Sequence, residues 1–301
     1  MTFEIPKETY KEKVIEVTLG GGLKALKIGG ESTPAFHQFE GAWPNPPRFA
    51  LEVYDSKPAD WAAALVEEYR DVLDDPVEWA RKCAESYGAE AICLQLASTS
   101  PIEKDTPARD AALLTRRVAE AIDLPLIVYG TGSEEKDIEV LSAVAEACAG
   151  RNLMLGPLVK KNFEAVANTA QQFGHGVVLQ TALEIPEAKE LNLKLTKTFP
   201  PDKVLYDPLS PALGYGMEYG YSVMERMKLA GTSFGDPNLR MPLVANIGTE
   251  CWDTNEAKEN KEQGLLWEAL TSLTYLLAGA NLVIVRHPKT PALVRKIISG
   301  S

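Results

Sequence analysis

Eight short apolar runs, spread over residues 49–286, constrain the fold of this chain more than any other feature. Each is rich in β-branched or aromatic residues, and several are hydrophobic almost throughout, as strands buried on both faces must be. The runs are Phe49–Asp55, Ala89–Leu96, Leu124–Gly130, Asn152–Leu158, Gly176–Thr181, Val204–Pro208, Pro242–Gly248 and Asn281–Arg286. They predict eight parallel strands.

Helical segments separate these runs. Asp75-Pro76 and Thr106-Pro107 each predict an N-cap followed by proline at the first helical position. Ser133 precedes two glutamates, where acids favour a helix start. Further helices are expected at Asn162–Phe173, Met217–Leu229, Gly264–Leu277 and Pro291–Ser299. Eight strands alternating with helices predict an α/β fold, a (β/α)8 TIM barrel over residues 49–301, since such barrels need about 250 residues.

Residues 1–48 do not fit the repeating pattern. The triplet Gly20-Gly21-Gly22 lies between two alternating runs, Lys13–Leu19 and Leu23–Ile28, which is typical of a β-hairpin. A Pro-rich arm, residues 42–47, follows. The hairpin either closes the bottom of the barrel or meets a partner. A doubly wound sheet is the alternative fold, but its glycine-rich fingerprint is missing after Asp55.

Charge and cysteine usage exclude several classes of protein. The net charge is −11, and the longest basic runs are pairs, so we expect no nucleic-acid partner. No run is long enough to span a membrane, and residues 1–13 lack the apolar stretch of a signal peptide, so we expect a cytoplasmic protein. The four cysteines form no CxxC pair and the three histidines form no cluster, which argues against a metal site within the chain.

Ligands of such barrels bind at the carboxyl ends of the strands. Those ends carry small residues and neutral hydrogen-bonding groups rather than the groups that drive hydrolysis. We therefore expect no catalytic residue here, and a binding surface for a large ligand. Its predicted members are Ser98, Thr99, Thr131, Gly132, Gln180, Thr181, Asp207, Asn246, Gly248 and Thr249.

Several of these positions allow two interpretations. Asp55 and Asp207 are either acid–base groups or caps of the following loop. His287 either ligates a metal or makes loop hydrogen bonds. The loop of residues 131–133 enters a helix, and its backbone N–H groups are candidates for binding a phosphate or an amide-rich ligand. The run Asp207–Tyr221 brings three glycines and three tyrosines to a strand–helix junction, and it adds Tyr215 and Gly216 to the predicted ligand contacts.

The segment DPLSPALGYGMEYGYSVMERMKLA, residues 207–230, resembles the corresponding segment of the corrinoid/iron–sulfur protein small subunit and of the archaeal acetyl-CoA decarbonylase/synthase delta subunit. Residues 27–55 and 128–141 are similar to the same family. The resemblance covers most of the chain. It implies a TIM barrel that pairs with a larger subunit, which itself carries a [4Fe-4S] cluster and a corrinoid domain.

The resemblance further implies a methyl carrier of the reductive acetyl-CoA (Wood–Ljungdahl) pathway. The corrinoid (cobalamin) would sit between the subunits, take a methyl group from methyltetrahydrofolate through a methyltransferase, and deliver it to acetyl-CoA synthase. Such a chain is not a catalyst alone, because the cofactor supplies the chemistry while the protein orients and encloses it. Neutral strand-end groups would suit the amides of a corrin edge, and we expect a mouth short of acids, which would limit protonation of Co(I).

Two other interpretations remain. A dihydropteroate-synthase-like barrel would bind a pterin itself, with Asp55, Asp207 and Asn246 as candidate contacts, and would then bind methyltetrahydrofolate in isolation. A purely structural subunit would stabilise the larger chain without touching the corrin. In that case, mutation of Thr131 or Asn246 would leave the bound corrinoid unchanged.

Overall fold

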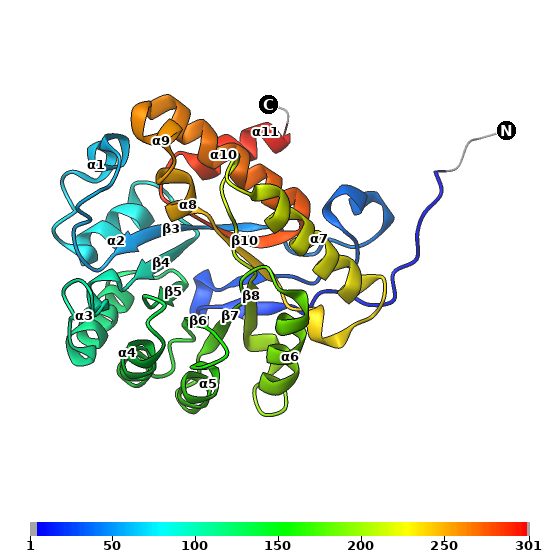
Figure 1. Cartoon of the computed structure of the whole chain (residues 1–301), viewed down its shortest axis with the longest axis horizontal. Coiled ribbons are helices and arrows are strands. Elements are labelled where there is room, and N and C mark those ends of the chain that lie inside the picture. The colour runs from blue at the N-terminus through cyan, green and yellow to red at the C-terminus, as the bar shows by residue number, and fades with distance from the viewer. Residues whose placement is uncertain (1–4, 300–301) are drawn as a thin grey trace.

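The computed structural model describes residues 5–299, and its centre is a closed eight-stranded parallel barrel (Figure 1). The barrel strands are β3 (Arg48–Tyr54), β4 (Ala91–Gln95), β5 (Leu126–Tyr129), β6 (Met154–Leu158), β7 (Gly176–Gln180), β8 (Val204–Asp207), β9 (Leu243–Asn246) and β10 (Ala280–Val285). All eight predicted strands are confirmed, and β10 closes the barrel against β3. The predicted domains, 1–48 and 49–301, include residues 1–4 and 300–301, which lie outside the described residues.

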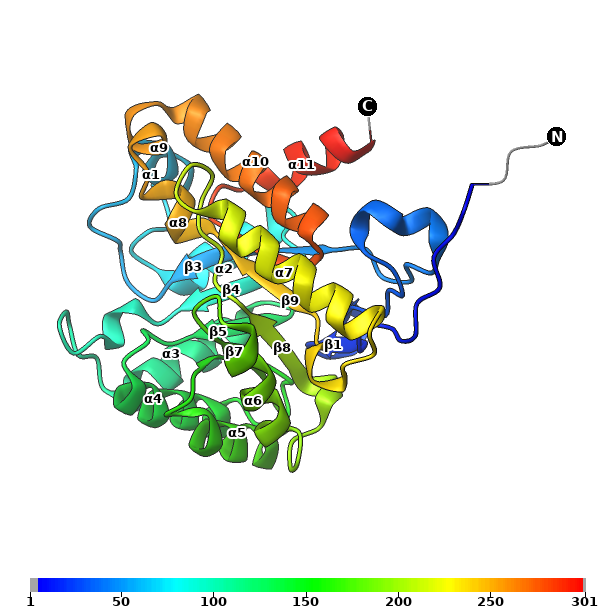
Figure 2. The same ribbon diagram turned by 45° about the vertical axis from the view of Figure 1, so that its right-hand side comes forward.

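Helices surround the barrel and cover its outer face (Figures 1 and 2). They are α1 (Ala63–Tyr69), α2 (Pro76–Glu85), α3 (Ala108–Ala121), α4 (Glu134–Ala147), α5 (Phe163–Gln172), α6 (Ile185–Leu195), α7 (Met217–Thr232), α8 (Gly248–Trp252), α9 (Asn255–Glu259), α10 (Lys261–Ala278) and α11 (Thr290–Ser299). One predicted helix start was wrong: α3 begins at Ala108, with Pro107 outside the helix rather than Thr106 as its N-cap. Asp75 does cap α2, accepting hydrogen bonds from the N–H groups of Val77 and Glu78.

The apolar core has two layers, because strand side chains alternate between the barrel interior and the surrounding helices. The outer layer joins strand residues such as Leu51 and Val128 to the inward faces of the helices. The inner layer fills the barrel with residues that include Ala50, Cys93 and Val178. Among the described residues, the barrel interior is therefore packed through its middle, and a ligand inside the barrel would have to lie at one of its ends.

A β-hairpin closes the end of the barrel where the strands begin (Figure 2). Its strands, β1 (Val17–Leu19) and β2 (Leu26–Ile28), pair antiparallel and are shorter than predicted. Val17, Leu19 and Ile28 are fully buried and belong to the interior layer of the barrel. The side-chain amide of Asn152, just before β6, donates to the backbone oxygens of Thr18 and Gly20 at 3.0 and 2.8 Å. Of the two predicted roles, closure of the barrel is the one observed.

A buried ion pair fastens the arm that follows the hairpin. Lys228 of α7 donates to Glu31 at 2.5 Å and to the side-chain oxygen of Asn281 at 2.6 Å. Asn281 in turn donates to Glu31 at 2.8 Å. Because an unpaired buried charge is strongly destabilising, this triad ties residues 29–33 to α7 and β10.

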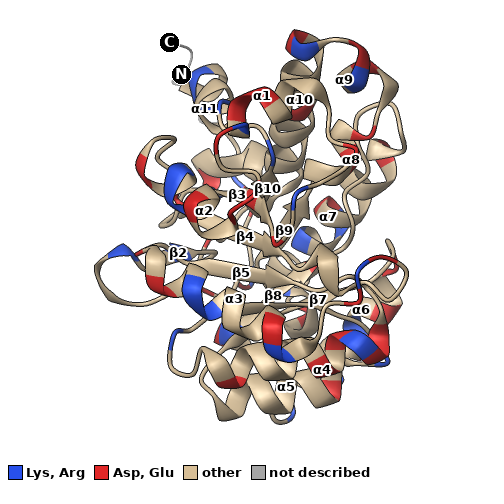
Figure 3. Ribbon diagram, turned by 90° about the vertical axis from the view of Figure 1, so that its left-hand side faces the viewer, with Lys and Arg blue, Asp and Glu red and all other residues tan. Residues whose placement is uncertain are grey.

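The outer surface carries charges of both signs. Figure 3 shows acidic and basic residues interspersed on the outer helices, without an extended basic surface on that side. Among residues 5–299, no helix has both the length and the apolar character needed to cross a bilayer.

Candidate functional site

A cavity of about 500 Å³ opens at the carboxyl ends of β5 to β9. Six of the predicted ligand contacts line it: Thr131, Gly132, Gln180, Asp207, Asn246 and Thr249. Seven lining residues were not among the predicted contacts: Gly130, Pro157, Leu183, Leu209, Ser210, Pro211 and Glu250. The walls therefore come from the carboxyl ends of five consecutive strands and the loops that follow them, which is where barrels of this kind bind ligands.

Asp207 lies at the base of the cavity and is almost fully buried. Its carboxylate accepts hydrogen bonds from the Leu209 N–H at 2.9 Å, the Gln180 amide at 3.1 Å and the Tyr129 hydroxyl at 3.2 Å. Burial raises the pKa of Asp207 to about 6, and the three donors oppose that rise. Asp207 therefore caps the loop that follows β8, and its carboxyl is also a titratable group of the cavity with a raised pKa.

A second acid, Glu250, also lines the cavity. Partial burial and repulsion from Asp253 raise its pKa, while Arg286 lowers it. The expectation of a mouth short of acids was therefore wrong. The first turn of α8 directs Glu250 to the cavity, and Asp207 ends β8 inside it.

Two polar side chains in the cavity lack hydrogen-bond partners within the described residues. The Oδ1 atom of Asn246 and the Oγ atom of Ser210 are both buried without a partner. Buried polar atoms are nearly always paired, since leaving one unpaired costs about 1–3 kcal/mol. Two such atoms in a single cavity indicate a site that a ligand completes.

The loop from Gly130 to Gly132 forms one wall, and Asp137 of α4 holds it. The two carboxylate oxygens of Asp137 accept the N–H groups of Thr131 and Gly132, each at 2.9 Å. A side chain at Gly130 would collide with this carboxylate. The backbone donors proposed for a phosphate or an amide are thus already occupied by an acid, and that interpretation of the loop was wrong.

Two leucines that line the cavity adopt left-handed backbone conformations. Leu183 has φ of 61° and Leu209 has φ of 67°. Such values are uncommon outside glycine and persist only where surrounding contacts enforce them. Here the Leu209 N–H bonds Asp207, and the Leu183 N–H donates to the Pro208 oxygen at 3.1 Å. The sequence around Leu183 gave no signal of this geometry.

A buried ion pair supports the wall near Thr249. Arg286, at the end of β10, pairs with Glu52 of β3 and donates to the Thr249 hydroxyl at 2.7 Å. It also donates to the Tyr54 hydroxyl and lies over the Trp61 ring, 4.8 Å from its centre. The ion pair with Glu52 therefore neutralises the charge of Arg286 beside the cavity.

Six predicted contacts do not line the cavity. Ser98 donates to Asp55 at 2.5 Å, so this aspartate caps the loop after β4. Thr99 donates to the Leu96 oxygen, and Thr181 bonds the Tyr206 hydroxyl.

The remaining three lie on α7 and α8 or beside them. Tyr215 is half-exposed and donates to Glu256 at 2.9 Å, outside the cavity. Gly216 precedes α7 with φ of 101°, a conformation that favours glycine. Gly248 is needed for packing, because a Cβ there would lie 2.9 Å from the Arg286 side chain.

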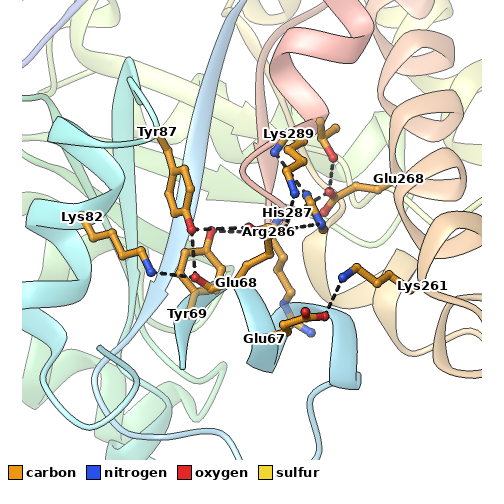
Figure 4. A network of polar contacts seen from close by, with 11 residues as sticks. Glu67, Glu68, Tyr69, Lys82, Tyr87, Lys261, Glu268, Arg286, His287 and Lys289 are labelled. Atoms are coloured by element: carbon orange, nitrogen blue, oxygen red, sulfur yellow. Dashed lines mark hydrogen bonds and ion pairs between the residues drawn. The ribbon is translucent and has the colours of Figure 1, made fainter. Parts of the chain in front are cut away.

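His287 is a structural residue. Its ring stacks on Trp252, its Nδ1 accepts the Lys289 N–H at 3.2 Å, and its Nε2 lies 3.8 Å from Glu68 (Figure 4). Burial lowers its pKa to about 4, so the ring is neutral at pH 7. Of the two interpretations of His287, the loop role is the one observed.

The four cysteines are buried free thiols, and Cys251 lies within α8 rather than in a loop. Burial raises the pKa of Cys83 to about 12. Among residues 5–299, no cluster of His, Cys, Asp or Glu has the arrangement of a metal site.

A hairpin-closed parallel barrel with a polar cavity at the opposite end defines the class of this protein, and its fold matches the dihydropteroate synthase barrel. The Xanthomonas albilineans enzyme superimposes with a TM-score of 0.58 at 17% identity, covering 85% of this chain and 92% of that one. The Thermus thermophilus enzyme gives 0.56 at 14% identity, over 86% and 95%. At these identities the likeness concerns the fold.

Sequence comparison gives the family. Residues 16–296 match the model of the CO dehydrogenase/acetyl-CoA synthase delta subunit, and the chain belongs to that family. The acetyl-CoA decarbonylase/synthase complex subunit delta of Archaeoglobus fulgidus is 37% identical over 320 residues, covering 99% of this chain and 70% of its own length. Subunit delta 2 of Methanosarcina acetivorans is 35% identical over 290 residues, 91% of this chain and 66% of its own length. The chain thus spans about two thirds of the length of such relatives.

Proposed function

We propose that this chain is the small subunit of a heterodimeric corrinoid methyl carrier in the reductive acetyl-CoA pathway. Its family supports an assembly role, because the relatives are named as subunits of the acetyl-CoA decarbonylase/synthase complex. The observation that carries the proposal is the open cavity at the carboxyl ends of the strands, where the Asn246 and Ser210 oxygens lack partners.

The cavity residues fit the edge of a corrinoid. A corrin bears amide side chains, and Gln180, Asn246, Ser210 and Thr249 offer neutral polar groups to them. The bound corrinoid would supply the cobalt chemistry of methyl transfer. The chain's own residues would bind and orient its edge, while His287 is buried away from the cavity and provides no ligand to cobalt.

The [4Fe-4S] cluster and the corrinoid domain are assigned to the larger partner subunit. The buried thiols of this chain support that assignment, because cluster ligands are thiolates that must reach the metal. The methyltetrahydrofolate methyltransferase and acetyl-CoA synthase would then be transient partners at the cavity end. We place the assembly in the cytoplasm.

The outward face of α10 supports a subunit interface beside the cavity. Between Gln263 and Leu277 the only charged residue is Glu268, and it is buried. Leu266 and Leu270 are 52% and 44% exposed on this uncharged face. The Trp267 ring N–H of the same helix donates to the Leu213 oxygen in the loop after Pro211, so the face is continuous with the cavity wall. We assign it to the large corrinoid subunit, since exposed apolar surfaces of this kind mark protein contacts.

A pterin site is the second candidate. The buried Asp207 and the half-buried Asn246 both line a cavity large enough for a small heterocycle. One fold neighbour, the X. albilineans dihydropteroate synthase, is described in complex with 7,8-dihydropteroate. On this alternative the isolated chain would bind methyltetrahydrofolate.

The test compares the chain purified without oxygen, alone and with its large subunit, by visible absorption and by cobalt and iron analysis. We expect a corrinoid band and cobalt in the complex, with iron following the larger subunit. Asn246→Leu should lower the cobalt content of the complex, and the matched amide variant Gln172→Leu, at the exposed end of α5, should not. A complex without corrinoid would leave a purely structural subunit, and methyltetrahydrofolate binding by the chain alone would favour the pterin site.

A further inference from the structure

The cavity presents several hydrogen-bond acceptors. The Oδ1 of Asn246 and the Oγ of Ser210 have no partner among the described residues. Gln180 donates its Nε2 to Asp207, and this orients its amide so that the Oε1 atom remains an acceptor. With the carboxylates of Asp207 and Glu250, five side chains offer oxygen atoms around one space.

Three backbone donors and one hydroxyl at the same place are already engaged. Asp137 holds the N–H groups of Thr131 and Gly132, and Asp207 holds the N–H of Leu209 and the hydroxyl of Tyr129. These bonds take up the backbone N–H groups of Thr131, Gly132 and Leu209.

The charge in the cavity is negative or neutral. No lysine, arginine or histidine is among its lining residues. Arg286 donates to the hydroxyl of the lining Thr249, but it is paired with Glu52. A carboxylate or phosphate entering this cavity would meet Asp207 and Glu250 without a compensating charge, whereas a neutral N–H group would complete the free acceptors.

We propose that the cavity selects neutral groups bearing N–H donors and rejects their carboxylate counterparts. This inference rests on the proposed function, because the N–H donors would be the primary amides on the corrin edge. An aminopyrimidinone ring presents the same donor chemistry, and the experiment below separates the two sources.

The experiment measures binding of three probes by the full chain, alone and assembled with its large subunit, using isothermal titration calorimetry. Dicyanocobinamide carries the corrin amides, cobyrinic acid carries carboxylates at the same positions, and 6-methylpterin carries the aminopyrimidinone edge. We expect cobinamide to bind at least about tenfold more tightly than cobyrinic acid. Asn246→Leu should weaken cobinamide binding by about tenfold, the effect of one lost hydrogen bond, and Gln172→Leu should leave it unchanged.

The outcomes separate this inference from the proposed function. Equal or tighter binding of cobyrinic acid would overturn the inference while the corrinoid function stands. If 6-methylpterin were the only probe that bound, selection of N–H donors would stand and the corrinoid function would be overturned. Binding of none of the probes, or an Asn246→Leu variant that binds cobinamide like the wild type, would overturn the inference.

Discussion

At the scale of single residues, Asp207 shows how a binding site and fold stability oppose each other. Its carboxyl is buried at the base of the cavity, and its pKa rises to about 6 because desolvation outweighs three hydrogen-bond donors. Ionisation of such a group at neutral pH destabilises the folded chain. A residue that stabilised the fold best at this position would not be a charged one, which supports a role in ligand binding.

We expect Asp207→Asn to increase the free energy of unfolding at pH 7 by about 1–3 kcal/mol, since one pKa unit is worth about 1.4 kcal/mol. The folded pKa of Asp207 lies above that of an unfolded aspartate, so its stability contribution falls as the pH rises from about 4 to 6. The variant should lose this dependence. Urea unfolding at a series of pH values measures it, with the exposed Asp123→Asn as control. A variant less stable than the wild type at pH 7 would contradict the expectation.

Cavity residues were predictable from the sequence where they lie at the carboxyl end of a barrel strand. Asp207 and Asn246 end β8 and β9, and the ends of parallel barrel strands meet at one face. Asp137 was not predictable, because its role depends on a side chain one helical turn into α4 folding back on the preceding loop. Ser98 lies at a strand end too, but its hydroxyl is used by Asp55, and no periodicity reveals such a pairing.

At the scale of elements, the hairpin and the barrel form one packed unit. The β1–β2 hairpin buries Val17, Leu19 and Ile28 in the same interior layer as the barrel strands. The eight barrel strands were readable from sequence because burial on both faces leaves continuous apolar runs. The hairpin strands were overestimated, because alternation continues beyond the three residues that pair on each side. Helices α1, α6, α8 and α9 were missed, three of them because they are too short to establish a repeating amphipathic pattern.

Leu19→Ala should lower the free energy of unfolding by about 2–5 kcal/mol, as for other buried leucines. Leu23→Ala, in the turn of the same hairpin, should change it by less than about 0.5 kcal/mol, because Leu23 is fully exposed. Chemical denaturation followed by circular dichroism measures both. Equal effects of the two substitutions would show that the hairpin does not pack into the barrel.

At the scale of the whole molecule, the chain combines a net charge of −11 with one uncharged helix face. Charged residues of both signs lie along α2 to α6 (Figure 3). The α10 face lies between α7 and α11 (Figure 1). This asymmetry favours a single partner bound on one side of the barrel. Sequence reasoning from strands and helices did not locate it, since the outward face of a helix is known only once its neighbours are placed.

The double substitution Leu266→Glu and Leu270→Glu should weaken assembly with the large subunit by at least about tenfold, because it buries charges in the proposed interface. Leu193→Glu on α6 is the matched control, since Leu193 is also 52% exposed. Size-exclusion chromatography of the mixed subunits measures assembly, and circular dichroism checks that each variant folds. Unchanged assembly of the double variant would place the interface elsewhere.

The packed interior also affects how a small molecule leaves. Because side chains fill the middle of the barrel among the described residues, a molecule in the cavity leaves on the side of the strand–helix loops that line it. A partner that settles over these loops turns the cavity into a closed compartment. A bound molecule then exchanges with solvent at the rate at which the partner uncovers the cavity. Its residence time is therefore set by the assembly rather than by the barrel alone.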